Sequence, residues 1–478
     1  MHRSQFVLCI HVCLVTLCFA ASSPQEPHYR DGEHNERYTH EETDRHQTLS
    51  PTQQLAEDLL NGNEIVSTEL YSKFFPVETI TEGLGFMESF ANVVAVDTSD
   101  GLVLIDSGHT LLMDNNYRNL RKWSTKPVHT IILTHGHYDH IFGITVFDQE
   151  AEKNGWPKPR VISHAAVVDR FERYKLTNGY NSRINAKQFA GLVKEFEYLR
   201  TDFRYPDLTY NTKNFTLKVG NIIFELHWAR GETDDITWVH MPAFQAVASG
   251  DLFAWTVPNA GNPQKVQRYP GDWAVALREI AALNPKIVLP GHGPPLIGQN
   301  RIYDMLTTTS DYLQSLVDQT LELMNQGHNL NYIIHNVRVP EKYKSKPYLT
   351  PVYDEPEFIV RNIWRMYGGW WDLNPANLKP PRDEDFALEI IQIVGGSHVL
   401  ARRAYQLASA GKTDIACSLV ELAYLSDPED PDILWNYIAV YRMRAEDPSV
   451  TSLMAKAIYK ASVVEKQDKL DNITATLE

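Results

Sequence analysis

The sequence predicts an α+β region followed by an all-helical region. Four apolar runs of strand length each end in polar side chains, and an amphipathic stripe of helical spacing begins near residue 303. A chain of 478 residues is long enough to hold two domains and to bury a large core. We therefore expect mixed α/β structure in the first part of the chain and helices in the second.

The four apolar runs are interpreted as buried strands. Each is short and is followed by a turn residue or a polar side chain, which is typical of a strand that ends at a tight turn. The polar residues that follow these strands could complete a common site. The runs are 102–108, 131–140, 246–252 and 287–293.

The run 131–140 carries four candidate metal ligands within six residues. His135 and His137 would share one ion, because alternate side chains of an extended chain point to the same face. If the chain then turns into a helix, Asp139 and His140 leave it in a different direction and can serve a second ion. Imidazole nitrogen and carboxylate oxygen are donors that zinc, manganese and iron accept. The spacing predicts a binuclear metal site.

The order and spacing of the four runs resemble the metallo-beta-lactamase superfamily over about residues 65–297. The resemblance implies an αβ/βα four-layer sandwich. It makes Asp251 the carboxylate that bridges both ions, and it makes His292 a ligand of the second ion beside Asp139 and His140.

The first ion, with His135 and His137, needs a third ligand. Most of the superfamily places a His there, whereas the matching segment of this chain offers acids. A Glu at this point resembles the zinc-dependent alkylsulfatases, so the resemblance assigns Glu232, with Asp234 or Asp235 as the alternative. A solvated acidic turn is the other interpretation.

The chain after residue 303 is predicted to be helical. A stripe of apolar and aromatic residues precedes Gly327, which stands where a helix would end. Two short amphipathic helices, broken at Gly411, are predicted over 401–425. The stripe consists of Tyr312, Leu313, Leu316, Val317, Leu321 and Met324.

The segment GWWDLNPANL at 369–378 supports the same branch of the superfamily. It resembles the signature of the alkylsulfatase dimerisation domain. The resemblance implies that the helical region is a dimerisation domain and that the protein is a homodimer. A generic helical repeat is the alternative, and 401–425 alone would indicate no more than that.

Two departures from the alkylsulfatases concern the substrate. Asp251 stands where that family uses a bridging Glu, and 253–264 differs from the Asn- and His-rich segment that holds sulfate in the family. The metal chemistry therefore transfers better than the substrate does. The candidate substrate contacts, any of which could be a surface residue, are Arg230, Asn259, Asn262, Gln264 and Arg268, with Lys265 as a further cation.

The predicted activity is hydrolysis with two divalent ions, expected to be zinc, although other divalent metals would suit the ligands. Two ions lower the pKa of a bridging water, so hydroxide serves as the nucleophile, oriented by Asp139 and Asp251. The resemblance implies an alkyl sulfate ester as substrate. The alternatives are another ester, a lactone, a phosphoester or a beta-lactam. A non-catalytic scaffold is a third class, against which the intact ligand set argues.

The N-terminus predicts export to the secretory lumen or the medium. Residues 6–21 are mostly apolar, follow Arg3 and end in small residues, as a cleaved signal does; an uncleaved anchor is the alternative. The net charge of −15 argues against nucleic acid as a partner, and no later run reaches the about 20 apolar residues of a membrane span. The predicted parts are a signal peptide at 1–21, a disordered leader at 22–55, the catalytic domain at 56–297, the helical dimerisation domain at 298–440, and a C-terminal helix and tail at 441–478.

Overall fold

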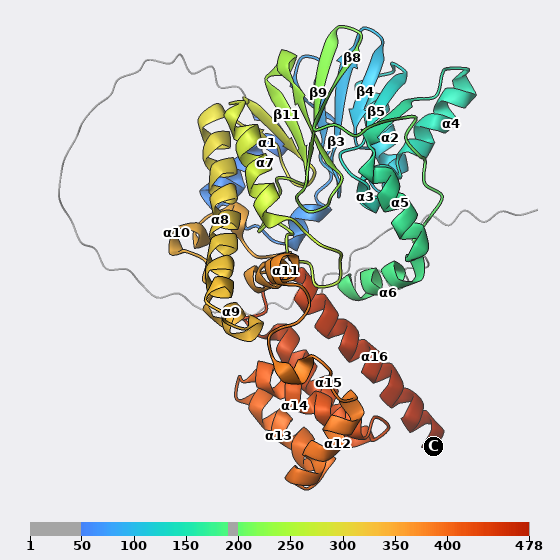
Figure 1. Ribbon diagram of the computed structural model, residues 1–478. Helices are drawn as coiled ribbons and strands as arrows, with labels where there is room; N and C mark the ends of the chain where they lie inside the picture. The colour runs from blue at the N-terminus through green and yellow to red at the C-terminus, as the bar shows by residue number, and fades with distance from the viewer. Residues whose placement is uncertain (1–48, 190–198, 478) are drawn as a thin grey trace, which may run out of the picture. The chain divides into compact units, whose positions relative to one another are not determined.

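Residues 49–189 and 199–477 are described by a computed structural model (Figure 1). The predicted signal peptide and the predicted leader up to residue 48 lie outside the described residues. Within them, two β-sheets lie face to face and helices cover their outer sides. The predicted α+β class and four-layer sandwich are confirmed.

The first sheet contains strands β1 to β7 in chain order, and the second runs β13-β12-β11-β10-β9-β8. The pairs β4–β5, β5–β6 and β6–β7 are parallel, as is β11–β12. All four runs predicted to be strands form strands. The bounds are β1 Glu78–Thr81, β2 Leu84–Met87, β3 Val93–Thr98, β4 Gly101–Ile105, β5 Val128–Ile132, β6 Arg160–His164, β7 Leu208–Tyr210, β8 Asn214–Val219, β9 Ile222–Ala229, β10 Ile236–Met241, β11 Ala246–Gly250, β12 Ile287–Pro290 and β13 Leu296–Ile297.

Alternation along the strands builds two cores from each sheet. On β5, Ile132 faces the core between the two sheets, whereas its neighbour Ile131 faces the core under the outer helices. The same alternation separates Ile105 from Leu104 on β4. Because both faces of these strands are buried, the runs are continuously apolar and not alternating in polarity.

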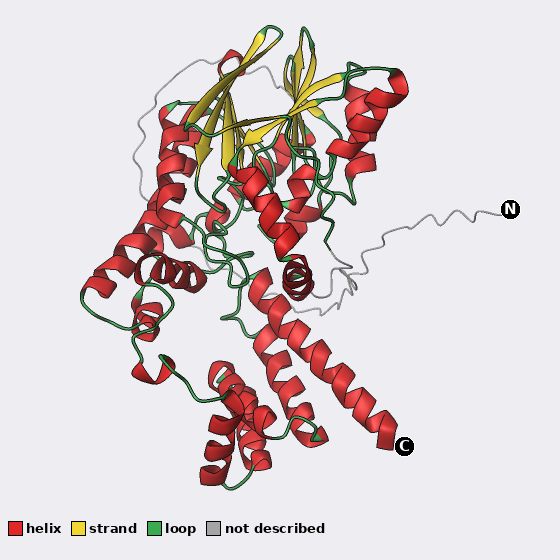
Figure 2. Ribbon diagram, turned by 45° about the vertical axis from the view of Figure 1, so that its right-hand side comes forward, coloured by secondary structure: helices red, strands yellow, loops and turns green. Residues whose placement is uncertain are grey.

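Helices cover both outer faces of the sandwich (Figures 1 and 2). The first sheet packs on α2, α4 and α5, and the second packs on α1, α7 and α8. Between β5 and α4 lies the short helix α3, and α6 follows α5. The bounds are α1 Pro51–Asn61, α2 Met113–Trp123, α3 Tyr138–Ile141, α4 Ile144–Asn154, α5 Ala166–Leu176, α6 Asn178–Gln188, α7 Pro270–Ala282 and α8 Gln299–Asn325.

The described chain after α8 is helical apart from its connections, as predicted. The predicted stripe lies on α8, which ends at Asn325, and Gly327 follows with φ 82°. Gly411, with φ 77°, separates α13 from α14. The bounds are α9 Leu330–Asn336, α10 Glu341–Lys344, α11 Pro356–Gly368, α12 Asp383–Val394, α13 Ser397–Ser409, α14 Thr413–Ser426, α15 Pro431–Glu446 and α16 Leu453–Leu477.

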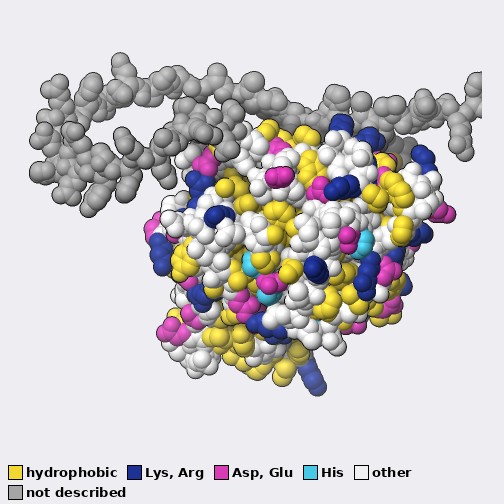
Figure 3. Space-filling view, turned by 90° about the horizontal axis from the view of Figure 1, so that it is seen from above, with side chains coloured by type: hydrophobic (Ala, Val, Ile, Leu, Met, Phe, Trp, Pro, Cys, Tyr) yellow, Lys and Arg dark blue, Asp and Glu magenta, His cyan; other side chains and the backbone are white. Residues whose placement is uncertain are grey.

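The predicted domain boundaries stay predictions. α8 and α11 pack into the same core as the second sheet, and α15 runs through residue 440. In residues 49–189 and 199–477, no helix combines the length and the apolar character needed to cross a membrane. Acidic and basic side chains are interspersed on the face seen in Figure 3.

Candidate metal centre

The first four candidate ligands lie where β5 gives way to a helix. His135 and His137 stand in the turn after the strand, and α3 carries Asp139 and His140. His137 is the N-cap residue of α3 and has an extended backbone. The chain therefore turns as predicted, and the two pairs of side chains leave it in different directions.

Asp251 and His292 reach the same place from neighbouring strands. They follow β11 and β12, which run parallel, so both residues lie at the carboxyl edge of the sheet. The two segments pass so close that a Cβ at position 291 would lie 2.1 Å from Asp251 Oδ1. Gly291 is thus the residue type that this approach allows.

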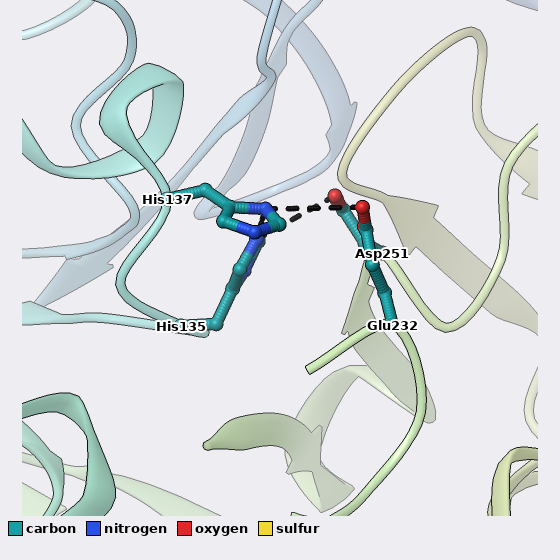
Figure 4. Close-up of side chains that lie close together, drawn as sticks. All are labelled: His135, His137, Glu232 and Asp251. Carbon is teal, nitrogen blue, oxygen red and sulfur yellow. Dashed lines mark hydrogen bonds and ion pairs between the residues drawn. The ribbon is translucent and has the colours of Figure 1, made fainter. Parts of the chain in front are cut away.

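The first group of candidate ligands consists of His135, His137, Glu232 and Asp251 (Figure 4). One donor atom from each lies within 4.8 Å of the others. His135 Nε2 is 3.6 Å from Asp251 Oδ2, and His137 Nδ1 is 3.9 Å from Glu232 Oε1. These side chains point toward one another from three separate parts of the chain.

The second group consists of Asp139, His140 and His292. Asp139 Oδ2 lies 3.5 Å from His140 Nε2 and 3.4 Å from His292 Nε2. Asp251 joins this group to the first, since its oxygens lie 3.4 Å from His140 Nε2 and 3.5 Å from His292 Nε2. Its position between the groups is the one that a bridging carboxylate requires.

The two groups fit divalent cations. Asp251 Oδ1 and His140 Nε2 are buried, and neither has a hydrogen-bond partner in the described part of the chain. Buried polar atoms without partners are costly. Imidazole nitrogens combined with carboxylate oxygens are a ligand set of zinc and related metals. The site therefore provides for divalent metal binding, and the role of each residue as a ligand stays a prediction.

The protonation states of the first group suit metal binding. Burial lowers the pKa of His135 to about 4, and it lowers the pKa of His137 well below its usual value. Both rings are then neutral near pH 7, the form in which an imidazole binds a metal. Burial raises the pKa of Glu232 to about 7 against the opposing charge of Arg268. A divalent ion beside this carboxylate would favour its ionised form.

Asp106, at the end of β4, orients His140. Its Oδ2 lies 2.7 Å from His140 Nδ1, and its Oδ1 accepts the backbone N–H of Thr134 at 2.7 Å. A ring that donates Nδ1–H to a carboxylate presents its Nε2 lone pair to the metal site. Asp106 lies in the predicted strand run 102–108, but its role as the partner of His140 is visible only in the structure.

Two predicted substrate contacts, Arg268 and Asn259, lie against Glu232. Arg268 Nη1 donates to Glu232 Oε1 at 2.6 Å and to the Glu232 carbonyl oxygen at 2.8 Å. Asn259 Nδ2 also donates to Glu232 Oε1. These contacts hold the carboxylate in place, and the substrate role of both residues stays a prediction.

Asp234 and Asp235, the alternatives to Glu232, have other partners. Arg170 donates to both carboxylates, with 2.7 Å between its Nε and Asp235 Oδ2. The same Asp235 oxygen accepts the backbone N–H of Gly136 at 3.0 Å. Glu232 therefore lies in the first group. Asp235 instead holds the turn between His135 and His137. Arg170 lies within α5 and had no signal in the sequence.

The remaining predicted substrate contacts, Arg230, Asn262 and Gln264, lie in two different environments. Arg230 pairs with Asp272 at 2.6 Å. Asn262 Nδ2 donates to Gln188 Oε1 on α6 at 3.3 Å, and its Oδ1 accepts the backbone N–H of Gln264.

Lys265 lies beside these residues and also reaches α6. Its Nζ donates to Asn185 Oδ1 at 2.6 Å. Burial and the charge of Arg268 lower the pKa of Lys265 to about 7, while Glu232 and Asp139 oppose this shift. Lys265 is therefore a half-buried cation within the electrostatic reach of both metal groups.

Two family models match the chain. The model of the metallo-beta-lactamase superfamily matches residues 87–292, and the model of alkyl sulfatase dimerisation matches residues 329–468. These matches cover the sandwich with its metal groups and the helical region, respectively.

Two sulfatases are similar to most of the chain. The chain is 25% identical over 354 residues to a linear primary-alkylsulfatase of Pseudomonas sp., which covers 70% of this chain and 66% of that protein. It is 23% identical over 362 residues to an alkyl/aryl-sulfatase of Saccharomyces cerevisiae, which covers 71% of this chain and 56% of that protein. The chain thus spans less than two thirds of the length of these relatives.

A solved structure agrees with the fold. A stereoselective inverting sec-alkylsulfatase from Pseudomonas sp. superposes with a TM-score of 0.73 at 19% identity, covering 82% of this chain and 65% of that one. The predicted resemblance is confirmed: the sandwich matches the metallo-beta-lactamase superfamily, the helical region matches alkyl sulfatase dimerisation, and the relatives compared are sulfatases.

Proposed function

We propose that the protein is a hydrolase with two divalent metal ions that cleaves alkyl sulfate esters. One observation carries this proposal: two groups of ligands lie side by side and share Asp251. Two-metal hydrolases hold their ions close together in this way. The seven proposed ligands are His135, His137, Glu232 and Asp251 for the first ion, and Asp139, His140 and His292, again with Asp251, for the second.

The relatives support the choice of substrate. One relative is named a linear primary-alkylsulfatase and the other an alkyl/aryl-sulfatase, and each matches about 70% of this chain. Glu232 supports the same branch, because the resemblance to alkylsulfatases predicts a Glu at this position. An alkyl sulfate carries a negative charge. Lys265 is the proposed partner for it, because its amino group interacts electrostatically with Glu232 of the first metal group and Asp139 of the second.

The residues of the chain divide the work of hydrolysis. Two bound ions would lower the pKa of water toward neutrality and supply hydroxide. Asp139 and Asp251 would orient this hydroxide, because their oxygens lie 3.4 or 3.5 Å from the Nε2 atoms of His140 and His292. Lys265 binds a sulfate oxygen by a charge-assisted hydrogen bond.

A second candidate keeps the metal site and changes the substrate. Asp251 stands where the alkylsulfatases use a bridging Glu, and the segment 253–264 departs from the segment that the resemblance connects with sulfate. These departures permit hydrolysis of another ester, a lactone, a phosphoester or a beta-lactam. The metal groups would be the same, so the two candidates differ in substrate alone.

Three further properties belong to the proposal. The expected metal is zinc, which histidine and carboxylate ligands suit, as they also suit other divalent metals; elemental analysis of the purified protein tests this. The protein is a homodimer, which the match of the helical region to alkyl sulfatase dimerisation supports. Sedimentation equilibrium tests this, and a monomer would contradict it. The protein is exported after cleavage of its signal, and an intact N-terminus on protein recovered from the medium would contradict this.

Sulfate release from a medium-chain alkyl sulfate tests the activity. The full chain with Zn²⁺ is compared with His137→Ala and with His240→Ala. His240 contacts Glu225 at 2.7 Å and belongs to neither metal group, so it serves as the matched control. We expect release by the wild type and by His240→Ala, and none by His137→Ala. A protein that holds two ions but releases no sulfate would favour the second candidate.

A further inference from the structure

Residues 259–268, here named the Glu232 loop, connect the metal site to the helical region. The loop begins with Asn259 and ends with Arg268, and the side chains of both residues donate to Glu232 Oε1. Arg268 also donates to the carbonyl oxygen of Glu232 at 2.8 Å. The position of this carboxylate in the first metal group thus depends on both ends of the loop.

One side chain of α11 binds both ends of the loop. Asn362 Nδ2 donates to the carbonyl oxygens of Ala260 and Arg268, each at 2.9 Å. Its Oδ1 accepts Gln267 Nε2 at 3.0 Å and the backbone N–H of Arg268 at 3.3 Å. Asn362 therefore acts as a clamp that holds the ends of the Glu232 loop together.

Gly261, near the first end of the loop, also lies directly against α11 and the segment before it. The backbone N–H of Gly261 donates to Asp354 Oδ2 at 2.6 Å. A Cβ at position 261 would lie 2.2 Å from the backbone nitrogen of Ile359 and 2.3 Å from the carbonyl carbon of Phe358. The loop and the helix approach each other so closely that a side chain at position 261 would force them apart.

Burial makes these contacts matter. Asn362 is 5% exposed and Arg268 is 3% exposed. Removing the amide of Asn362 would leave two buried carbonyl oxygens without this donor, and a buried polar group that loses its partner favours a rearranged loop. The rearrangement would act on Asn259 and Arg268, and through them on Glu232.

We propose that Asn362, a residue of the alkyl sulfatase dimerisation region, is a positioning residue for the first metal ion. It acts through the Glu232 loop, and the inference rests on the proposed two-metal site. The helical region then has a second role besides association, because it completes the shell around a metal ligand of the sandwich.

Metal titration of the full chain tests this inference. Metal-free wild type, Asn362→Leu and the control Asn436→Leu are titrated with Zn²⁺ and, for visible absorption, with Co²⁺. Asn436 is a buried residue of α15 whose Nδ2 donates to the carbonyl oxygen of Asp432 at 2.7 Å. Glu232→Gln and Asp139→Asn provide the reference spectra for loss of the first and of the second ion.

The expected result is a selective loss. Asn362→Leu should weaken binding of the first ion about tenfold, in the range seen for outer-shell partners, and leave the second ion unchanged. Asn436→Leu should bind both ions as the wild type does. Equal binding of both ions by Asn362→Leu and wild type would overturn the inference, as would an equal weakening of both ions.

Two further measurements test the inference even if Asn362→Leu fails to fold. Gly261→Ala separates the loop from α11 without changing a polar side chain, and it should reproduce the selective loss. In the wild type, Zn²⁺ should slow amide exchange in both the Glu232 loop and α11; an unchanged α11 would contradict the coupling. A wild type that takes up no Zn²⁺ would overturn the proposed metal site itself, and with it the inference. Normal uptake by both variants would overturn the inference alone.

Discussion

Arg268 holds Glu232 by two hydrogen bonds from one nitrogen, one to the carboxylate at 2.6 Å and one to the carbonyl oxygen at 2.8 Å. Both side chains are buried. Removing one partner of a buried ion pair leaves the charge of the other uncompensated, which typically costs about 3 kcal/mol or more of stability. Loss of Arg268 alone is therefore expected to destabilise the metal-free protein as well as to displace a ligand.

We expect Arg268→Met to lower the free energy of unfolding of the metal-free protein by about 3 kcal/mol at pH 8, where Glu232 is ionised. Urea unfolding measures this. Zn²⁺ should reduce the loss, because an ion beside Glu232 replaces the missing positive charge. The double variant Arg268→Met with Glu232→Gln is the control, and it should recover most of the stability. A double variant as unstable as Arg268→Met would show that packing, and not charge, causes the effect.

Lys265→Met should raise the KM for an alkyl sulfate and change kcat less. A charge-assisted hydrogen bond contributes about 1.5 to 3 kcal/mol, which corresponds to a rise in KM of about tenfold or more. Steady-state kinetics separate the two constants. Lys213→Met is the matched control, because Lys213 is an exposed cation that pairs with Glu279. An unchanged KM in Lys265→Met would remove this residue from the substrate site.

The parts of the site that could be predicted are local in sequence. The ligands of 131–140 stand within one short run, and Asp251 and His292 each follow an apolar strand, so pattern and resemblance together point to them. The clamp by Asn362 could not be predicted, because Asn362 and Arg268 are 94 positions apart and neither belongs to a periodic pattern.

The same limit applies to Arg170 and to the substrate contacts. Arg170 meets Asp235 across 65 positions, and one Arg on a helix gives no sign of its partner. Arg230 is predicted as a substrate contact only because it lies near the ligand runs in the sequence. In the fold it pairs with Asp272. The break between α13 and α14, by contrast, could be predicted from Gly411 itself. Glycine adopts a positive φ at little cost, and Gly411 has a φ of 77°.

Asp106→Asn should weaken the second metal ion. The carboxylate of Asp106 faces His140 Nδ1 at 2.7 Å, and loss of such a partner lowers metal affinity by about 10- to 100-fold. The backbone should tolerate the change, since Asp106 has φ 60° and Asn adopts this region readily. Competition with a Zn²⁺ chelator measures the affinity. Asp97→Asn, which alters an exposed ion pair with Lys126, should bind both ions normally, and a similar loss there would contradict the argument.

Glu88 predicts how stability changes with pH. This carboxyl is 1% exposed, and burial, together with the charge of Glu78, raises its pKa to about 8. The unfolded chain has the ordinary pKa of about 4.5, so between these values the folded state binds one more proton than the unfolded state. The contribution of Glu88 to stability is then most favourable below pH 4.5, becomes less favourable as the pH rises, and levels off above pH 8.

Glu88→Gln should remove this contribution and stabilise the protein by at most about 3 kcal/mol at pH 7, since each pKa unit corresponds to about 1.4 kcal/mol and the buried amide carries a desolvation cost of its own. The expected gain is small at pH 5, because the wild-type carboxyl is then largely neutral in the folded state and costs little there. Urea unfolding of both proteins at pH 5, 7 and 8 measures the difference. Glu82→Gln, at an exposed turn, is the control and should change stability little at any of these pH values. A Glu88→Gln protein that is no more stable than the wild type at pH 8 would show that this carboxyl is ionised at no cost inside the fold.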